Sequence, residues 1–371
     1  MLIQNAKAFI DGKFQEKTDL LIRDGRISAI GTGLAAEGEE LLDLGGDLLL
    51  PGFVDVHIHA FKGMDTMQGE EAVRHMSREL KKVGVAAFLP TTMSASPEDT
   101  VRALAGVKAV MERPEPDGAI VLGAHMEAPF LAEAKAGAQL KQYFVDPDEE
   151  NWQRYTCGLE SVVRLITMAP ERAGALAFIS ALTKKGIAVS IGHTTADAET
   201  THAAAEAGAT HVTHTFNAQT PLNHRAPGVP GAALVDDRLQ CEVISDGIHL
   251  HPDIVKLIIR TKGKEKLVAI TDAMEAAGMP DGQYQLGGQE VFVHEGAARL
   301  KDGTLAGSTL TMIRAFQNLI RFGATPEEAA LMTTKTPALS IGNEELGEIE
   351  LGAPAIFSRF DENYAFKGTV G

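Results

Sequence analysis

The strongest constraint on the fold is an alternation, from Pro51 onward, of short apolar runs with longer stretches rich in alanine and glutamate. Apolar runs of strand length that are separated by helical stretches are typical of parallel sheets built from βα units. Eight such runs lie at 53–59, 85–92, 120–127, 163–169, 187–193, 211–217, 241–249 and 267–272. Eight units are what a closed (β/α)8 barrel of the TIM type needs, so this α/β fold is predicted. An open doubly wound sheet is the alternative, but no glycine-rich dinucleotide loop follows the first run.

The two ends of the chain have a different pattern. Residues 1–50 contain short apolar runs separated by Asp-Gly and Gly-Gly pairs, which is typical of β-hairpins. The segment 347–366 is again β-like and can complete the same module. We therefore expect a small β-sandwich-like domain formed by 1–50 and 345–371, and a catalytic barrel at 51–344. Further Asp-Gly and Gly-Gly pairs predict hairpins at 281–304.

The composition and net charge of the chain limit the kinds of molecule that it is expected to bind. Hydrophobic residues make up 44% of the chain and charged residues 23%, which is ordinary for a globular protein. The formal net charge of −16 argues against a nucleic acid or an anionic membrane surface as partner. An anionic small substrate stays possible, because a few arginines, histidines or backbone N–H groups can bind a phosphate. Only Cys157 and Cys241 are present, so no disulfide framework is expected, and a reducing cytoplasm fits best.

Side chains of metal-ligand type stand at the carboxyl ends of most of the apolar runs. They are His57, His59, Glu127, His193, His214, His249 and Asp272. The active site of a (β/α)8 barrel is built at the carboxyl ends of its strands, so these side chains are expected to converge. His57 and His59 also share a face, because side chains alternate along a strand. A converging set of this kind is difficult to explain as solvated surface or as core.

The residue types in this set indicate a reaction. Imidazole and carboxylate ligands suit Zn²⁺, Fe²⁺, Mn²⁺ or Co²⁺. Such an ion makes water a usable nucleophile near neutral pH, and a neighbouring carboxylate can take up the proton and pass it to the leaving group. The residues therefore predict metal-assisted hydrolysis. His125 stands two residues before Glu127, and a packing role is favoured for it over a ligand role.

The motifs at these positions resemble, in order, those of a known superfamily. They are 51–59 followed by Gly63-Met64-Asp65, then 125–130, 192–194, 214–218, 245–249, 271–273 and 305–308. Together they resemble the amidohydrolase superfamily, and within it the family that removes the acetyl group from N-acetylglucosamine 6-phosphate to give glucosamine 6-phosphate and acetate. The likeness runs from about residue 50 to residue 310, and the ends of the chain fit the β domain of that family.

The resemblance implies a metal centre and a catalytic carboxylate. Glu127, His193 and His214 resemble the ligands of the principal metal, and His57 and His59, with Glu127 bridging, resemble a second site. Zinc or iron is implied, with one or two ions per subunit. Asp272 resembles the acid/base. The family usually has glycine after the glutamate, and this chain has Ala128, so the turn must have a negative φ or the loop must have shifted.

The resemblance also implies a substrate site and a homodimer. Asn217 and Ala218 resemble residues that meet the sugar phosphate through backbone N–H groups. Arg225 resembles the phosphate-binding arginine, which the family often supplies across a dimer interface. His249 resembles a substrate-binding histidine, and the segment 305–308, which includes Leu305 and Ala306, resembles the loop near the acetyl group. Gln139 stands where many members have a histidine that contacts the sugar, and its amide can still bond a hydroxyl.

Three alternatives stay open at this point. The substrate can instead be N-acetylgalactosamine 6-phosphate. A relative that hydrolyses another amide is a second alternative, although the subclass that bridges two metals with a carboxylated lysine is disfavoured, because 163–169 contains no lysine. A barrel that has lost its metal and serves as a scaffold is the third, and it predicts gaps in the ligand set, of which we find none.

Overall fold

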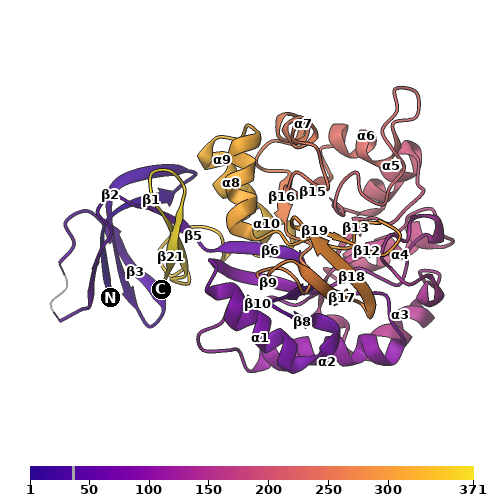
Figure 1. The fold of residues 1–371 in the computed structure, drawn as a ribbon, viewed down its shortest axis with the longest axis horizontal. Coiled ribbons are helices and arrows are strands. Elements are labelled where there is room, and N and C mark those ends of the chain that lie inside the picture. Colours follow the sequence, from indigo (N-terminus) through magenta and orange to yellow (C-terminus); the bar gives the residue numbers. More distant parts are fainter. Residues whose placement is uncertain (36–37) are drawn as a thin grey trace.

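The computed structural model of the protein describes residues 1–35 and 38–371, and its larger part is a barrel of parallel strands (Figure 1). The barrel strands are β6 (Phe53–Ile58), β9 (Val85–Thr92), β11 (Ala124–Met126), β12 (Val163–Met168), β13 (Ala188–Ile191), β14 (His211–Val212), β15 (Gln240–Ile244) and β16 (Leu267–Ile270). A short strand, β10 (Ile120–Val121), pairs with β9 alongside them. The predicted (β/α)8 fold is therefore confirmed.

The barrel is nearly closed where its first and last strands meet. The backbone N–H of Asp272 donates to the carbonyl of His57 at 2.8 Å across this seam. The carboxylate of Asp55 accepts from the backbone N–H of Thr271 at 3.3 Å and from its hydroxyl at 2.5 Å. These bonds hold the end of β16 beside the end of β6, which brings Asp272 next to the predicted histidine pair.

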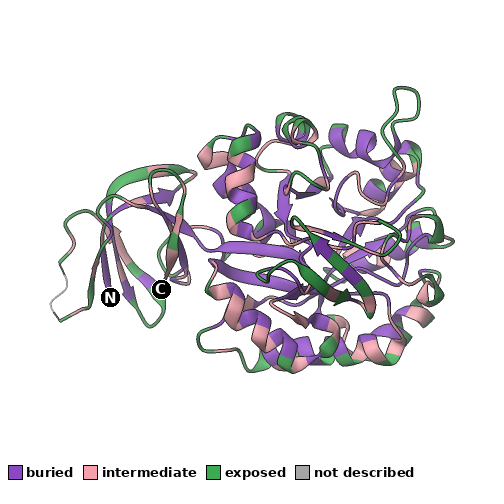
Figure 2. Ribbon diagram, in the orientation of Figure 1, coloured by how far each residue is buried: buried purple, intermediate pink, exposed green. Residues whose placement is uncertain are grey.

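Helices cover the outside of the barrel, and their apolar faces pack on the strands. They are α1 (Glu70–Lys81), α2 (Pro97–Glu112), α3 (Glu149–Thr156), α4 (Ala175–Lys184), α5 (Ala198–Ala207), α6 (Gly228–Val235), α7 (Pro252–Lys262), α8 (Met312–Phe322), α9 (Pro326–Thr333) and α10 (Lys335–Ser340). Sequence explains their ends: Thr325 caps α9 in a capping box with Glu328. Figure 2 shows the result, with the barrel strands buried along most of their length and most helices buried on one side.

The ends of the chain form one separate sheet, at the left of Figure 1. Its strands are β1 (Leu2–Ile10), β2 (Lys13–Arg23), β3 (Arg26–Gly31), β4 (Leu41–Asp43), β5 (Leu48–Pro51), β20 (Phe357–Phe360) and β21 (Phe366–Val370). β20 pairs antiparallel with β5, so the C-terminal segment completes the N-terminal module as expected. The module has its own apolar core, while the ring of Phe360 contacts Phe53 and Phe316 of the barrel. The domain boundaries after residues 50 and 344 stay a prediction.

Short elements lie over the carboxyl-terminal mouth of the barrel. The predicted hairpins are β17 (Gly282–Leu286), β18 (Gln289–His294) and β19 (Ala297–Arg299), drawn in orange in Figure 1. Their apolar side packs on Met93, Met274 and Ala306. Two short strands and four 3-10 turns complete the loops: β7 (Ala60–Phe61), β8 (Met64–Asp65), η1 (Thr66–Gln68), η2 (Glu133–Lys135), η3 (Lys141–Tyr143) and η4 (Glu160–Val162).

Several barrel strands are shorter than predicted, because the chain turns before the polar residues. The run 211–217 forms only the two residues of β14, and His214 and Phe216 then adopt φ values of 29° and 79°. The run 120–127 is divided between β10 and β11, with Gly123 at a φ of 147° between them. Glu127, His193 and His214 therefore lie in loops that begin where the strands end, whereas His57 lies within β6. Among the described residues, no helix is both long and apolar enough to cross a membrane.

Candidate active site

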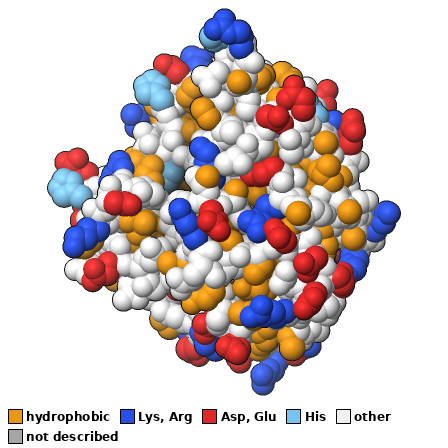
Figure 3. All heavy atoms as spheres, turned by 90° about the vertical axis from the view of Figure 1, so that its right-hand side faces the viewer, with side chains coloured by type: hydrophobic (Ala, Val, Ile, Leu, Met, Phe, Trp, Pro, Cys, Tyr) orange, Lys and Arg blue, Asp and Glu red, His pale blue; other side chains and the backbone are white. Residues whose placement is uncertain are grey.

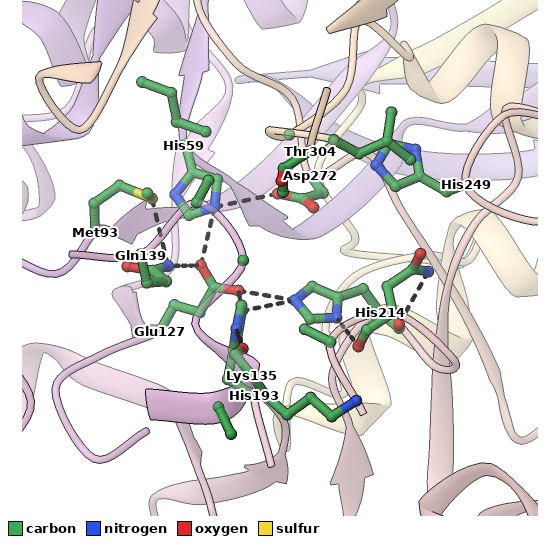
Figure 4. A pocket seen from close by; sticks show the side chains of 18 residues that line it. His59, Met93, Glu127, Lys135, Gln139, His193, His214, His249, Asp272 and Thr304 are labelled. Atoms are coloured by element: carbon green, nitrogen blue, oxygen red, sulfur yellow. Dashed lines mark hydrogen bonds and ion pairs between the residues drawn. The ribbon is translucent and has the colours of Figure 1, made fainter. Parts of the chain in front are cut away.

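A cavity of about 310 Å³ lies at the carboxyl ends of the barrel strands (Figure 4), and Leu286 of β17 is among the residues that line it. Ten of the predicted site residues line it: His59, Glu127, Gln139, His193, His214, Asn217, Ala218, His249, Asp272 and Leu305. Three others do not. His57 lies beneath the cavity in contact with its floor, Ala306 is buried behind the wall, and Arg225 lies on an exposed loop.

The carboxylate of Glu127 is the centre of the site. Its Oε1 lies 3.1 Å from Nε2 of His193 and 3.1 Å from Nε2 of His214, and the two nitrogens lie 3.1 Å apart. All three side chains are buried, and each offers one ligand atom within 4.8 Å of the others. Two imidazoles and one carboxylate that converge in this way could hold a divalent metal ion.

A second group shares the same carboxylate from the other side. Nε2 of His59 lies 3.2 Å from Oε2 of Glu127, and Nε2 of His57 lies 3.5 Å from Oε1. The two Nε2 atoms are 3.4 Å apart, because the alternation along β6 points both rings the same way. These three residues also satisfy the geometry of a cation site. Glu127 belongs to both groups, while the bridging role that the resemblance implies stays a prediction.

All four histidines present Nε2 to the centre and turn Nδ1 outward to an acceptor. Nδ1 of His193 lies 2.8 Å from the carbonyl of Lys135, that of His214 3.2 Å from the carbonyl of Asn217, that of His59 3.3 Å from the carbonyl of Thr91, and that of His57 3.1 Å from the carboxylate of Glu242. An acceptor at Nδ1 favours the tautomer with the proton there, which leaves the Nε2 lone pair for a metal. The donor set therefore fits a divalent cation.

The carboxylates and imidazoles of the site shift one another's pKa values. Burial alone would raise the pKa of Glu127, but His57 and the imidazoles bonded to its oxygens outweigh burial and hold that pKa well below its usual range. Burial would lower the pKa of His59, yet the carboxylates of Asp272 and Glu127 raise it well above its ordinary value. Without a cation, the raised pKa values of His57 and His59 favour protons on these two imidazoles beside the buried carboxylates, and binding of a cation would release such protons.

Asp272 stands at the edge of the cavity beside both groups. Its Oδ1 lies 3.1 Å from Nε2 of His59 and 3.6 Å from Nε2 of His57. Burial would raise the pKa of its carboxyl, but His57 and His59 outweigh burial and the pKa is lowered. The carboxylate is therefore ionised at neutral pH and can accept a proton.

Three of the central residues have a strained backbone. His193, His214 and Asp272 have φ values of 46°, 29° and 51°, in the left-handed region that non-glycine residues rarely adopt. Each follows the end of a barrel strand, and the turn directs the side chain into the mouth. Such strain costs on the order of 1–3 kcal/mol per residue and is typical of functional sites. Ala128 does not have a positive φ, so the backbone after Glu127 has a conformation that alanine tolerates.

The side chain of Gln139 lines the cavity and also donates a hydrogen bond to Glu127. Its Oε1 accepts from the backbone N–H of Ser94 at 2.7 Å, which orients the amide. Its Nε2 then donates to Oε2 of Glu127 at 2.6 Å. Both ends of the amide are engaged in this structure, so the expected contact with a sugar hydroxyl requires it to give up one of these bonds and stays a prediction.

The other predicted substrate residues lie on one side of the cavity. The backbone N–H of Asn217 donates to the carbonyl of His214 at 2.9 Å and is therefore engaged. The N–H of Ala218 has no acceptor among the residues that the structure describes. Nδ1 of His249 lies 2.7 Å from the carboxylate of Asp246, which also accepts from two backbone N–H groups and so orients the ring.

Arg225 is remote from the cavity of its own chain. It lies in the segment 221–227, which is exposed throughout and projects above α6 (Figures 1 and 2). Figure 3 shows this loop as the highest point of the surface, with basic and histidine side chains at its tip. The loop also carries Leu222, which is 41% exposed, and Val235 at the end of α6 is 75% exposed.

Sequence reasoning missed several residues of the site. Lys135, Met93 and Thr304 line the cavity, and Glu242 supports His57 from below. Of these, Glu242 had a signal, since it is an acidic residue within the apolar run Cys241-Glu242-Val243-Ile244, where a charge needs a partner. The packing role favoured for His125 is consistent with the structure, because its ring stacks edge-on against His57 and its nitrogens meet threonine hydroxyls.

Comparison with known proteins gives full-length matches. The sequence model of the Amidohydrolase family matches residues 48–368. An N-acetylglucosamine-6-phosphate deacetylase from Lysinibacillus sphaericus is 36% identical over 100% of this chain and 96% of its own length. An N-acetylgalactosamine-6-phosphate deacetylase from Escherichia coli O157:H7 is 37% identical over 91% of this chain and 88% of its own. A mutant N-acetyl-D-glucosamine-6-phosphate deacetylase from Mycobacterium smegmatis, solved with N-acetyl-D-glucosamine-6-phosphate, superimposes with a TM-score of 0.92 at 32% identity, covering 100% of this chain and 97% of that chain.

Proposed function

The chain belongs to the amidohydrolase family, and from that premise we propose that it hydrolyses N-acetylglucosamine 6-phosphate to glucosamine 6-phosphate and acetate. One observation carries the proposal. A buried carboxylate, Glu127, meets Nε2 of His193 and of His214 at 3.1 Å, with the ionised Asp272 beside them at the cavity edge. This is the arrangement that hydrolysis of an amide by an activated water requires. The enzyme is accordingly a hydrolase of linear amides.

The residues that would hold a principal metal are Glu127, His193 and His214, and those that would hold a second are His57, His59 and Glu127. A divalent cation, zinc or iron, bound there would supply Lewis acidity that polarises the acetyl carbonyl and acidifies a water molecule. The chain itself holds the ligand nitrogens in the required tautomer, through the acceptors at each Nδ1.

Asp272 is proposed to move the proton. Its carboxylate accepts the proton of the attacking water and later returns it to the amine as the C–N bond breaks. No covalent link to the enzyme is needed. His249, held by Asp246 at 2.7 Å, would orient the sugar, and Leu305, which also lines the cavity, would contact the acetyl group.

Binding of the phosphate group of the substrate requires positively charged side chains, and the cavity of one subunit contains few of them. Lys135 is the one lysine or arginine among the residues that line the cavity, and the N–H of Ala218 is directed to no acceptor within the described part of the chain. We propose that Arg225 of a second subunit completes the site in a homodimer. A basic loop tip flanked by the exposed Leu222 supports this arrangement. A cytoplasmic location is part of the proposal, and both cysteines are free, as a reducing compartment requires.

The direct test is acetate release from a panel of sugars. Protein stripped of metal and reconstituted with Zn²⁺ or Fe²⁺ is expected to release acetate from N-acetylglucosamine 6-phosphate, and much less efficiently from unphosphorylated N-acetylglucosamine. The stripped protein serves as the control and should be inactive. Absence of acetate release from every phosphorylated sugar, with metal bound, would refute the function.

N-Acetylgalactosamine 6-phosphate is the second candidate substrate. The 37% identity to the deacetylase from E. coli O157:H7 favours its inclusion, since that value matches the identities to the glucosamine enzymes. The two sugars differ only in the configuration at C4. The ratio of their kcat/KM values in the same panel decides between them.

Replacement of Arg225 by alanine is expected to raise KM for the phosphorylated substrate by about 10- to 100-fold, the equivalent of about 1.5–3 kcal/mol for a hydrogen bond to a charged group. The turnover number should change little, because the residue is remote from the chemistry. KM for the unphosphorylated sugar should not move. An unaltered KM for the phosphorylated sugar would show that Arg225 does not bind phosphate.

Mixed dimers test whether the arginine acts on the neighbouring subunit. Subunits with Arg225→Ala keep Asp272, and subunits with Asp272→Asn keep Arg225. If the arginine acts across the interface, refolding the two variants together restores a population with the wild-type KM. A mixture that keeps the raised KM would contradict action across the interface, and sedimentation analysis of the wild type checks for the dimer itself.

A further inference from the structure

Three of the four central histidines are supported by a backbone carbonyl, and only His57 is supported by a carboxylate. We propose that Glu242 is a positioning residue for the second cation site, that of His57, His59 and Glu127. It acts through His57 by orienting the ring, by keeping the proton on Nδ1, and by adding negative charge behind the ligand. This inference rests on the proposed function, because it concerns the metal centre of the same active site.

The placement of Glu242 argues against a bystander role. It lies on β15 within the barrel, and its side chain is 0% exposed. Oε2 lies 3.1 Å from Nδ1 of His57 and accepts from the backbone N–H of His214 at 3.4 Å. Oε1 has no hydrogen-bond partner within the described residues. A buried carboxylate is stable only when it is paired. Among the described residues, His57 is the one ion-pair partner of Glu242.

The contact between His57 and Glu242 bears on which ring nitrogen carries the proton. An ionised carboxylate only accepts, so the contact at Nδ1 favours the tautomer with the proton on Nδ1 and the lone pair on Nε2. That Nε2 lies 3.4 Å from Nε2 of His59 and 3.5 Å from Oε1 of Glu127. A carboxylate behind a histidine also makes the imidazole a stronger ligand, and loss of such support typically weakens metal binding by about 10- to 100-fold.

The surroundings of His57 agree with this role for Glu242. Glu127, Asp272 and Glu242 bring three buried carboxylates beside the ring of His57, and none of them forms an ion pair with a lysine or arginine among the described residues. Each of the three therefore depends on histidine as its ion-pair partner, and for Glu242 that histidine is His57.

The experiment counts metal ions instead of measuring activity. Full-length wild type, Glu242→Gln and Asp19→Asn are stripped with a chelator and titrated with Mn²⁺, with bound metal measured by mass spectrometry and by electron paramagnetic resonance. Glutamine keeps the shape of the side chain and an acceptor for His57, so the substitution removes the charge. Asp19 is a matched control: a buried carboxylate in the β1–β2 region, bonded to the N–H groups of Asn5 and Leu34 at 3.0 and 2.9 Å.

We expect the wild type and Asp19→Asn to bind two Mn²⁺ and to give the spectrum of a magnetically coupled pair. Glu242→Gln should keep the affinity of the principal site and lose about 10- to 100-fold at the second, with the six-line spectrum of an isolated ion at intermediate Mn²⁺. In a His57→Gln background, Glu242→Gln should have no further effect on metal binding, because it acts through His57.

Three results would overturn the inference: wild-type affinity for both ions in Glu242→Gln, equal weakening of both sites, or a single ion in the wild type. If Glu242→Gln fails to fold, long-range ¹⁵N spectra of histidine-labelled, Zn²⁺-loaded wild type provide the test, and a proton on Nε2 of His57 would refute the proposed role. Failure of the proposed function looks different, because the protein would then bind metal as described and release no acetate from any sugar.

Discussion

Replacing Asp272 with asparagine is expected to lower turnover by about 10²- to 10⁴-fold, the usual contribution of a positioned acid/base. Asparagine has the shape of the carboxylate but cannot accept a proton from water at neutral pH. The lowered pKa of Asp272 means that the free protein holds this group in its basic form. Asp272 belongs to neither of the two candidate ligand sets, Glu127 with His193 and His214, and Glu127 with His57 and His59. The Asp272→Asn variant should therefore retain its bound metal.

The measurement combines initial rates of acetate release with metal content from mass spectrometry. Asp197→Asn is the matched control: the same substitution at the cap of α5, outside the cavity, where asparagine caps as well as aspartate. It should have wild-type activity. Turnover of Asp272→Asn within a factor of ten of the wild type would contradict the acid/base role. Loss of the metal together with turnover would mean that Asp272 is needed as a ligand.

Replacing Glu127 with glutamine should have an even broader effect, because both metal groups share this carboxylate. We expect metal affinity to fall by more than the roughly 100-fold that marks the upper end for losses outside the ligand shell. Turnover should fall with it. An amide Nε2 at this position would also meet donors, since Nε2 of Gln139 donates to the carboxylate at 2.6 Å.

Dialysis against a metal buffer followed by metal analysis measures this loss, and rates at excess metal separate weak binding from impaired chemistry. Glu79→Gln is the matched control, since Glu79 pairs with Lys62 and Lys82 at the surface and does not line the cavity. It should bind metal as the wild type does. Full occupancy of Glu127→Gln at the metal concentration that saturates the wild type would show that Glu127 is not a principal ligand.

Much of the fold could be predicted from local patterns. Each barrel strand lies within or one residue beyond an apolar run of the sequence, because a strand covered on both faces must be apolar throughout. Convergence of Glu127, His193 and His214 followed from the same pattern, because the carboxyl ends of parallel strands meet at one mouth. The structure brings these three within 4.8 Å of one another, while their roles as ligands stay predictions.

The backbone conformation of the loops, and which of their side chains face the cavity, could not be predicted from local sequence patterns. Strand periodicity extended the run 211–217 through His214, although the backbone there turns into the left-handed region. The loop 305–307 presents Leu305 and Gly307 to the cavity and buries Ala306. A backbone of irregular conformation has no fixed period, so sequence spacing does not tell which side chain faces inward.

By itself, the sequence determined the (β/α)8 architecture, the β module formed by both chain ends, and the set of histidines and carboxylates at the strand ends. Only the tertiary structure decided which nitrogen of each histidine faces the centre, that Gln139 is bonded to Glu127, that Glu242 supports His57, and that Arg225 lies away from its own cavity. The reason is physical. Burial patterns are encoded locally in the periodicity of the chain, whereas hydrogen bonds between distant strands and the projection of a loop depend on how the whole barrel closes.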